Sequence, residues 1–189
     1  MELRQDGENE NRFELSFSSE APYMRWSGMP EILVHTKKAV NFTRIRTAGA
    51  LLFDHGSDSR IGRMPVGLIK SVTLDEEAHK GRAVIEFDPD DEDALKIRSK
   101  LQKKMLNGIS VGYRVTEWQV LREGEKSADG RFAGPCYLAT KWEPLEISVV
   151  ATPADPTVGV GRSISNEEDN DMPEIETVTR TCLLYTSPS

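Results

Sequence analysis

Short strand-like runs, each bounded by Gly, Pro, Asp or Asn, dominate the chain between residues 11 and 150. In the first run Phe13, Leu15 and Phe17 alternate with polar residues, which is the period of a strand with one buried face. Many short strands with this punctuation are typical of a mainly β domain whose sheet is closed or nearly closed. The runs lie at 11–20, 32–34, 50–53, 66–69, 82–87, 109–115, 137–142 and 145–150.

One segment has the period of a helix, from residue 90 to residue 106. Acidic residues crowd its first turn, lysines crowd its last turn, and Asn107-Gly108 supplies a left-handed stop. The acidic run 88–93 resembles a calcium loop, but Asp93 stands where that loop needs Gly and Ser99 where it needs Glu, so we interpret it as a helix start. The predicted buried stripe consists of Ala94, Ile97, Leu101 and Met105, helped by Leu95.

The charge distribution predicts a boundary near residue 165. The chain has 189 residues and a net charge of −7, and the segment 165–189 holds six acidic residues against one basic residue. Because that segment lacks hydrophobic periodicity, we expect an acidic linker or disordered tail there, after a single domain at 12–164 and a flexible N-terminus at 1–11. Residues 182–189 resemble a translated sequencing adaptor, and no functional inference rests on them.

Composition excludes several classes of protein. No run approaches the roughly 18 consecutive apolar residues of a membrane span, and the polar start lacks the apolar core of a signal peptide, so we expect an intracellular protein. The acidic balance disfavours nucleic acid as a partner. Cys136 and Cys182 form neither a CxxC pair nor a disulfide framework, which fits a reducing compartment and excludes structural zinc.

His55 is the histidine best placed for chemistry. It directly follows the apolar run 50–53 and opens a loop of small residues, and loops held by a rigid strand commonly present catalytic groups. A histidine there can accept a proton near neutral pH. A plain structural role for His55 stays open at this point, and we expect ordinary surface roles for His35 and His79.

Ser110 is the candidate nucleophile, bracketed by Gly108 and Gly112 as G-x-S-x-G. The α/β-hydrolase elbow with this spelling needs a strand before the serine, a helix after it and a later histidine. Here the helix comes first and no histidine follows His79, so that fold is excluded. The glycines would still let a substrate backbone approach the hydroxyl and leave N–H groups for an oxyanion. A plain helix-to-strand connection remains the alternative.

Glu146 is the candidate for the group that orients the histidine. It interrupts the apolar run 145–150, and a carboxylate in a buried strand is costly unless it is paired. Alternation places Glu146, Ser148 and Val150 on one face, so Glu146 either points outward or has a specific partner.

Other chemistries have weaker support, and we predict no metal and no cofactor. Asp54, His55 and Asp58 could outline a metal site, but a third strong ligand at a convincing spacing is missing. Glu143 and Glu146 could be a glycosidase pair, but no aromatic sugar subsite accompanies them.

Three motifs in order, 51–56 with 61–63, then 107–113, then 145–155, together resemble the prohead (capsid maturation) proteases of tailed bacteriophages. The resemblance covers about residues 12 to 163. It implies a compact β-barrel with flanking helices, similar to the herpesvirus assembly proteases (assemblin type), and a serine endopeptidase with Ser110 as nucleophile and His55 as general base. The herpesvirus relatives use a second histidine after the serine, which this chain lacks, so Glu146 is our candidate for the third residue. The segment 123–135 is expected to be a variable surface loop.

The resemblance also implies substrates and a location. The implied substrates are the scaffold protein, the major capsid protein and the protease itself, each cleaved through an acyl-enzyme. The implied location is the interior of the immature capsid in the host cytoplasm. A homo-oligomer would be compatible with this location. Two alternatives are a catalytically silent capsid-assembly or scaffold module and a small serine esterase or amidase.

Overall fold

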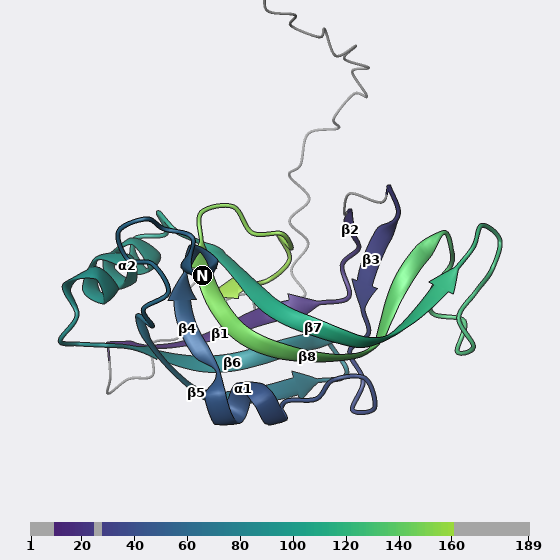
Figure 1. The fold of residues 1–189 in the computed structure, drawn as a ribbon, viewed down its shortest axis with the longest axis horizontal. Helices are drawn as coiled ribbons and strands as arrows, with labels where there is room; N and C mark the ends of the chain where they lie inside the picture. Colours follow the sequence, from purple (N-terminus) through teal and green to yellow (C-terminus); the bar gives the residue numbers. More distant parts are fainter. Residues whose placement is uncertain (1–9, 25–27, 161–189) are drawn as a thin grey trace, which may run out of the picture.

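A computed structural model describes residues 10–24 and 28–160, and most of the predicted flexible N-terminus and the whole acidic tail lie outside the described residues. Strands account for most of the regular structure, as predicted, and they form one sheet (Figure 1). The strands are β1 Arg12–Ser19, β2 Tyr23–Met24, β3 Pro30–Leu33, β4 Ala50–Phe53, β5 Gly67–Asp75, β6 Lys80–Phe87, β7 Gly108–Leu121, β8 Cys136–Val150 and β9 Gly159–Val160.

The long strand β8 organises the sheet. Along one edge it pairs antiparallel with β7, and along the other it pairs in parallel with β3 and β4. From β4 the sheet continues through β5, β6 and β1 to β9. The C-terminal ends of β4 and β8 and the N-terminal end of β7 therefore lie side by side, although these strands are far apart in sequence (Figure 1).

The sheet is not closed among the described residues, so the predicted β-barrel is not observed. For residues 10–24 and 28–160, the hydrogen-bonded path has separate ends at β2 and β9, and β7 pairs with β8 alone. Closure would require a ladder between β7 and β1, which lie near each other without forming one. Residues of both strands line the pocket described below, so side chains occupy the region between them.

The main core lies on the inner face of the sheet. Strand β6 alternates strictly between buried and half-buried residues, and β1 contributes Phe13, Leu15 and Phe17 as predicted from their spacing. These side chains pack with Phe87 and Leu51 and with the buried face of helix α2. A smaller cluster around Leu138 contains the buried, free Cys136.

Helix α2, Glu92–Gln102, is shorter than the predicted 90–106. Asp91 caps it by accepting hydrogen bonds from the N–H groups of Asp93 and Ala94, which confirms the acidic run as a helix start. Ala94, Ile97 and Leu101 are buried as predicted. Met105 was wrongly assigned to the stripe and is 69% exposed, because the chain leaves the helix before it and Lys104, not Asn107-Gly108, takes the left-handed conformation. A second helix, α1 Thr43–Ala48, precedes β4.

Strand β8 is one continuous strand, whereas the sequence predicted two separate runs at 137–142 and 145–150. The break was expected at Glu143-Pro144, but a bulge absorbs the proline: Tyr113 pairs with Pro144 and Gly112 pairs with Glu146. Proline is tolerated in a sheet at such bulges, where a ladder hydrogen bond is already missing. The predicted surface loop at 123–135 joins β7 to β8, and Arg131 ties it to Glu20 by an ion pair of 2.8 Å.

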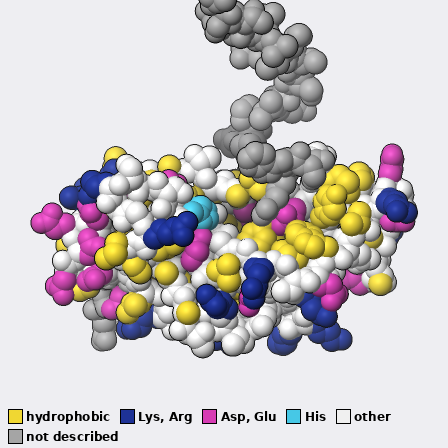
Figure 2. All heavy atoms as spheres, in the orientation of Figure 1, with side chains coloured by type: hydrophobic (Ala, Val, Ile, Leu, Met, Phe, Trp, Pro, Cys, Tyr) yellow, Lys and Arg dark blue, Asp and Glu magenta, His cyan; other side chains and the backbone are white. Residues whose placement is uncertain are grey.

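Charged side chains of both signs are spread over the face drawn in Figure 2. Exposed hydrophobic side chains on β2 and on the outer half of β7 include Tyr23, Met24, Trp118 and Val120. Within the described ranges, no helix is long and apolar enough to cross a bilayer.

Candidate active site

His55 is presented by a strained turn at the end of β4. Asp54, His55 and Gly56 form a short turn, η1, with φ values of 49°, 55° and 71°. The left-handed region is costly for residues other than glycine, by roughly 1 kcal/mol each, so two consecutive non-glycine residues there need support from the surrounding structure. The third position is glycine, which adopts this conformation without that penalty.

Ser110 lies on β7 directly opposite Ser148 on β8. Residues that face each other in an antiparallel pair share one face of the sheet, and so do residues two apart on a strand. Ser110, Gly112, Glu146 and Ser148 therefore share one face. On the other side of β8, Leu52 pairs with Ser148, and the chain turns at Phe53 to bring His55 over this face.

A chain of hydrogen bonds joins the three residues singled out in the sequence. The distance from His55 Nε2 to Ser110 Oγ is 2.9 Å, and that from His55 Nδ1 to Glu146 Oε1 is 2.6 Å. A carboxylate can only accept, so Nδ1 carries the proton and donates it to Glu146. In the neutral ring Nε2 is then the acceptor, and the Ser110 hydroxyl donates to it. Glu146 thus has a specific partner, which settles the alternative left open by strand alternation.

The surroundings of His55 raise the proton affinity of its ring. The hydrogen bond to Glu146 raises the pKa of His55 above its ordinary 6.5, and partial burial of the ring opposes that effect. The His55 side chain is 41% exposed and the Glu146 side chain 16% exposed. The ring can therefore exchange protons with solvent while its carboxylate partner is largely shielded.

Ser148, which the sequence analysis did not propose for the site, contacts two of these residues. Its Oγ donates to Glu146 Oε2 over 2.6 Å and accepts from the backbone N–H of His55 over 3.2 Å. Ser148 is fully buried. Its placement on the same strand face as Glu146 was the one signal in the sequence that could have identified it.

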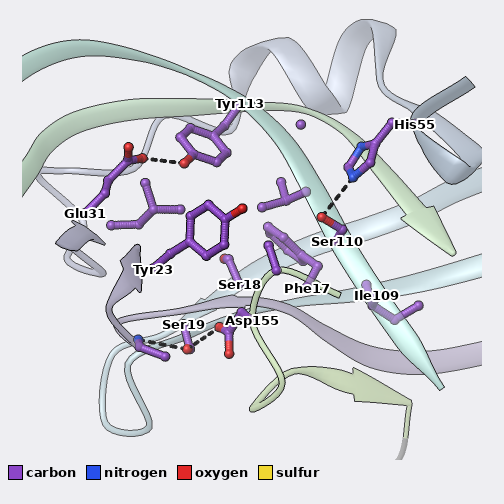
Figure 3. A pocket seen from close by; sticks show the side chains of 15 residues that line it. Phe17, Ser18, Ser19, Tyr23, Glu31, His55, Ile109, Ser110, Tyr113 and Asp155 are labelled. Atoms are coloured by element: carbon purple, nitrogen blue, oxygen red, sulfur yellow. Dashed lines mark hydrogen bonds between the residues drawn. The ribbon is translucent and has the colours of Figure 1, made fainter. Parts of the chain in front are cut away.

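A pocket of about 360 Å³ opens beside Ser110 and His55. Figure 3 shows Tyr23 between the Ser110 side and the Glu31–Tyr113 side of this pocket. The Tyr113 hydroxyl donates to Glu31, and the Ser19 hydroxyl donates to Asp155 over 2.5 Å. Apolar lining residues include Phe17, Leu33, Ile109 and Val111. The arrangement combines a hydroxyl held by a histidine with an adjacent, largely apolar pocket.

Residues 32–172 match the family described as caudovirus prohead serine protease. The chain belongs to this family. The match contains His55, Ser110 and Glu146, and it begins after β1 and β2, which supply Phe17 and Tyr23 to the pocket.

One relative of the chain is a major capsid protein of Halomonas phage phiHAP-1. The two are 34% identical over 149 residues, which make up 79% of this chain and 23% of the relative. The chain thus spans about a quarter of the length of the curated relative that it matches. A comparison with the solved structures finds no match.

The other two histidines bind partners other than Ser110. His35 is 1% exposed, so the predicted surface role is wrong: its Nδ1 donates to the Leu33 carbonyl over 2.7 Å and its Nε2 accepts from Ser18 over 2.8 Å. Burial lowers the pKa of His35 to about 4. His79 lies in the turn after β5, and its Nδ1 is 3.7 Å from Glu20 Oε2.

The metal site considered from the sequence does not form. Asp58 accepts hydrogen bonds from the backbone N–H groups of Arg60 and Ile61 and so shapes its own loop. Among residues 10–24 and 28–160, no group of three or more His, Cys, Asp or Glu could hold a metal ion. Glu143 forms an ion pair with Arg114 rather than a pair with Glu146.

Proposed function

We propose that this prohead protease domain is a serine endopeptidase in which Ser110 is the nucleophile, His55 the general base and Glu146 the group that orients His55. The observation that carries the proposal is the continuous chain of hydrogen bonds from Glu146 through His55 to Ser110, beside an open pocket. The family is described as one of serine proteases, which supports a serine as the nucleophile.

The proposed reaction proceeds in two steps. His55 Nε2 accepts the Ser110 proton while Oγ attacks a peptide carbonyl, and the C–N bond then breaks as His55 returns the proton to the leaving amine. Water, deprotonated by His55, next attacks the acyl-enzyme carbonyl, the ester C–Oγ bond breaks to release the acid, and His55 returns the proton to Ser110 Oγ. Glu146 stabilises the imidazolium formed in each step, and backbone N–H groups near Ser110 would hold the oxyanion.

The proposed substrates are capsid and scaffold proteins and the protease itself, inside the immature capsid in the host cytoplasm. Membership of a prohead protease family supports this location, and the match to part of a longer major capsid protein supports a link between this domain and capsid proteins. Ser110 and His55 are hydrogen-bonded to each other, which favours an enzyme over a silent assembly module.

The test combines an active-site probe with intact mass. We expect a fluorophosphonate to label the wild-type protein at Ser110, and to leave folded Ser110→Ala and His55→Ala unlabelled. With the cognate capsid protein, both free and assembled into proheads, we expect fragments only when Ser110 is present. Ser16→Ala, a buried serine variant outside the site, is the matched control.

Two results would contradict the proposal. Folded wild-type protein that is neither labelled nor cuts the capsid protein in either form would support the silent assembly module. Ser110-dependent hydrolysis of small esters without protein fragments would support an esterase.

A further inference from the structure

We propose that Ser148 is a positioning residue that fixes both the Glu146 carboxylate and the His55 turn; this role rests on the proposed protease function. The observation that carries the proposal is that the buried Ser148 hydroxyl lies between the Glu146 carboxylate and the backbone N–H of His55 and bonds to both. Neither the family match nor the relative assigns a role to this serine.

The direction of each hydrogen bond follows from chemistry alone. An ionised carboxylate has no proton, so Ser148 must donate to Glu146 Oε2. A backbone N–H can only donate, so Ser148 Oγ must accept from His55. The single hydroxyl hydrogen and one lone pair of Ser148 are thereby both used, each on a different member of the site.

Ser148 also occupies the point in the sheet where the three site segments meet. It pairs with Ser110 on β7 on one side and with Leu52 on β4 on the other. Glu146 lies two residues earlier on the same strand face. A group at this point can hold residues that are separated by 91 positions in sequence, as His55 and Glu146 are.

The carboxylate needs this support because a glutamate side chain has several rotatable bonds and loses rotamer freedom when it is fixed. One oxygen of Glu146 binds His55 and the other binds Ser148, so the carboxylate is held at both ends. Without Ser148 the second oxygen would lose this partner, and rotation toward solvent would recover a hydrogen bond at the expense of the one to His55.

The His55 turn needs support for a different reason. Asp54 and His55 both have positive φ, a conformation that persists only where surrounding contacts hold it. The bond from the His55 N–H to Ser148 ties the middle of this turn to the buried strand β8. Loss of that bond would free the imidazole to move relative to Ser110.

The experiment compares Ser148→Ala, Ser148→Thr and the control Ser16→Ala, which removes another buried strand serine. For Ser148→Ala we expect kcat to fall about 10- to 100-fold, as for a small misplacement of reacting groups, with KM changed by less than about twofold. We expect Ser148→Thr, which keeps the hydroxyl, to recover part of kcat, and Ser16→Ala to resemble wild type.

The ring titration of His55, followed by NMR with labelled histidine, separates positioning from general destabilisation. If Ser148 holds Glu146 in place, the pKa of His55 falls toward 6.5 in Ser148→Ala because the hydrogen bond that raises it is lost. If Ser148 served only the packing of β8, Ser148→Ala would unfold more readily while the pKa of His55 stayed the same.

The outcomes distinguish the two proposals. An unchanged His55 titration and unchanged kcat in folded Ser148→Ala would overturn the positioning role while leaving the protease assignment intact. If the wild-type protein has no Ser110-dependent activity, the protease assignment fails, and with it the catalytic meaning of Ser148; the titration then still decides whether Ser148 orients Glu146 and His55.

Discussion

Gly112 and Glu146 face each other across the β7–β8 ladder, and the Glu146 carboxylate occupies the space that a side chain at position 112 would need. A Cβ on residue 112 would fall inside van der Waals contact with the carboxylate and its neighbouring carbons. The second glycine of the G-x-S-x-G spelling therefore has a steric role here: it leaves room for Glu146 to reach His55.

Gly112→Ala should displace Glu146 from His55 and lower kcat/KM by roughly 10- to 100-fold, the cost expected for a misplacement of about 1 Å. The measurement is the rate of labelling by the fluorophosphonate or the rate of capsid-protein cleavage. In a Glu146→Ala background the same change should cost little, because the displaced group is already gone. Equal losses in both backgrounds would show that Gly112 acts independently of Glu146.

Glu146→Gln should change the pH profile as well as the rate. A general base must be unprotonated, so wild-type activity should rise with pH through a His55 pKa that lies above 6.5. Removing the carboxylate lowers that pKa and moves the acid limb to lower pH. The plateau should fall by about 10²- to 10⁴-fold, because the imidazolium loses its partner and the ring can adopt the wrong tautomer.

Glu143→Gln is the matched control for that experiment. Glu143 lies on the same strand but pairs with Arg114, away from His55. We expect the acid limb of the Glu143→Gln pH–activity profile to coincide with that of wild type. An acid limb that moves equally in both variants would indicate a general charge effect instead of a specific bond to His55.

The buried His35 should make the protein sensitive to mild acid. Its pKa is about 4 when folded and 6.5 by reference, so the unfolded chain binds the proton first as pH falls from 6.5 toward 4, and the lost stability grows over that window. Between pH 6.5 and 5 the free energy of unfolding should drop by about 1.5 kcal/mol from this group.

Urea unfolding at several pH values, compared with His35→Gln, measures this contribution. The other ionisable groups are present in both proteins, so their contributions cancel in the comparison. The variant should show the flatter dependence on pH between 6.5 and 5. Parallel curves would mean that His35 becomes protonated without leaving its site.

Asp91→Ala should destabilise helix α2 by about 1 kcal/mol, the usual cost of removing an N-cap side chain. Asp91 accepts from two backbone N–H groups that otherwise lack a helical partner. Asp90→Ala removes the same charge one residue earlier and should cost less. Thermal or urea unfolding of both variants provides the comparison, and equal losses would assign the effect to charge alone.

Local chemistry made several elements predictable from the sequence. The predicted runs 11–20 and 82–87 correspond to β1 and most of β6. The first was recognisable from alternation, because successive side chains of a strand point to opposite faces. The start of α2 follows from Asp91 and the acids beside it, since a cap acts on the next few N–H groups. The end of α2 was less predictable, because a left-handed residue there need not be glycine or asparagine.

Local patterns along the chain were enough to predict a mainly β domain and three candidate residues, His55, Ser110 and Glu146. The folded arrangement was needed to show that these residues meet, that Ser148 contacts two of them and that His35 is buried. It also showed that β1 and β7 form no ladder among the described residues. The reason is physical: strand and helix periods are set by neighbours along the chain, whereas strand pairing, register and burial depend on contacts summed over the whole core.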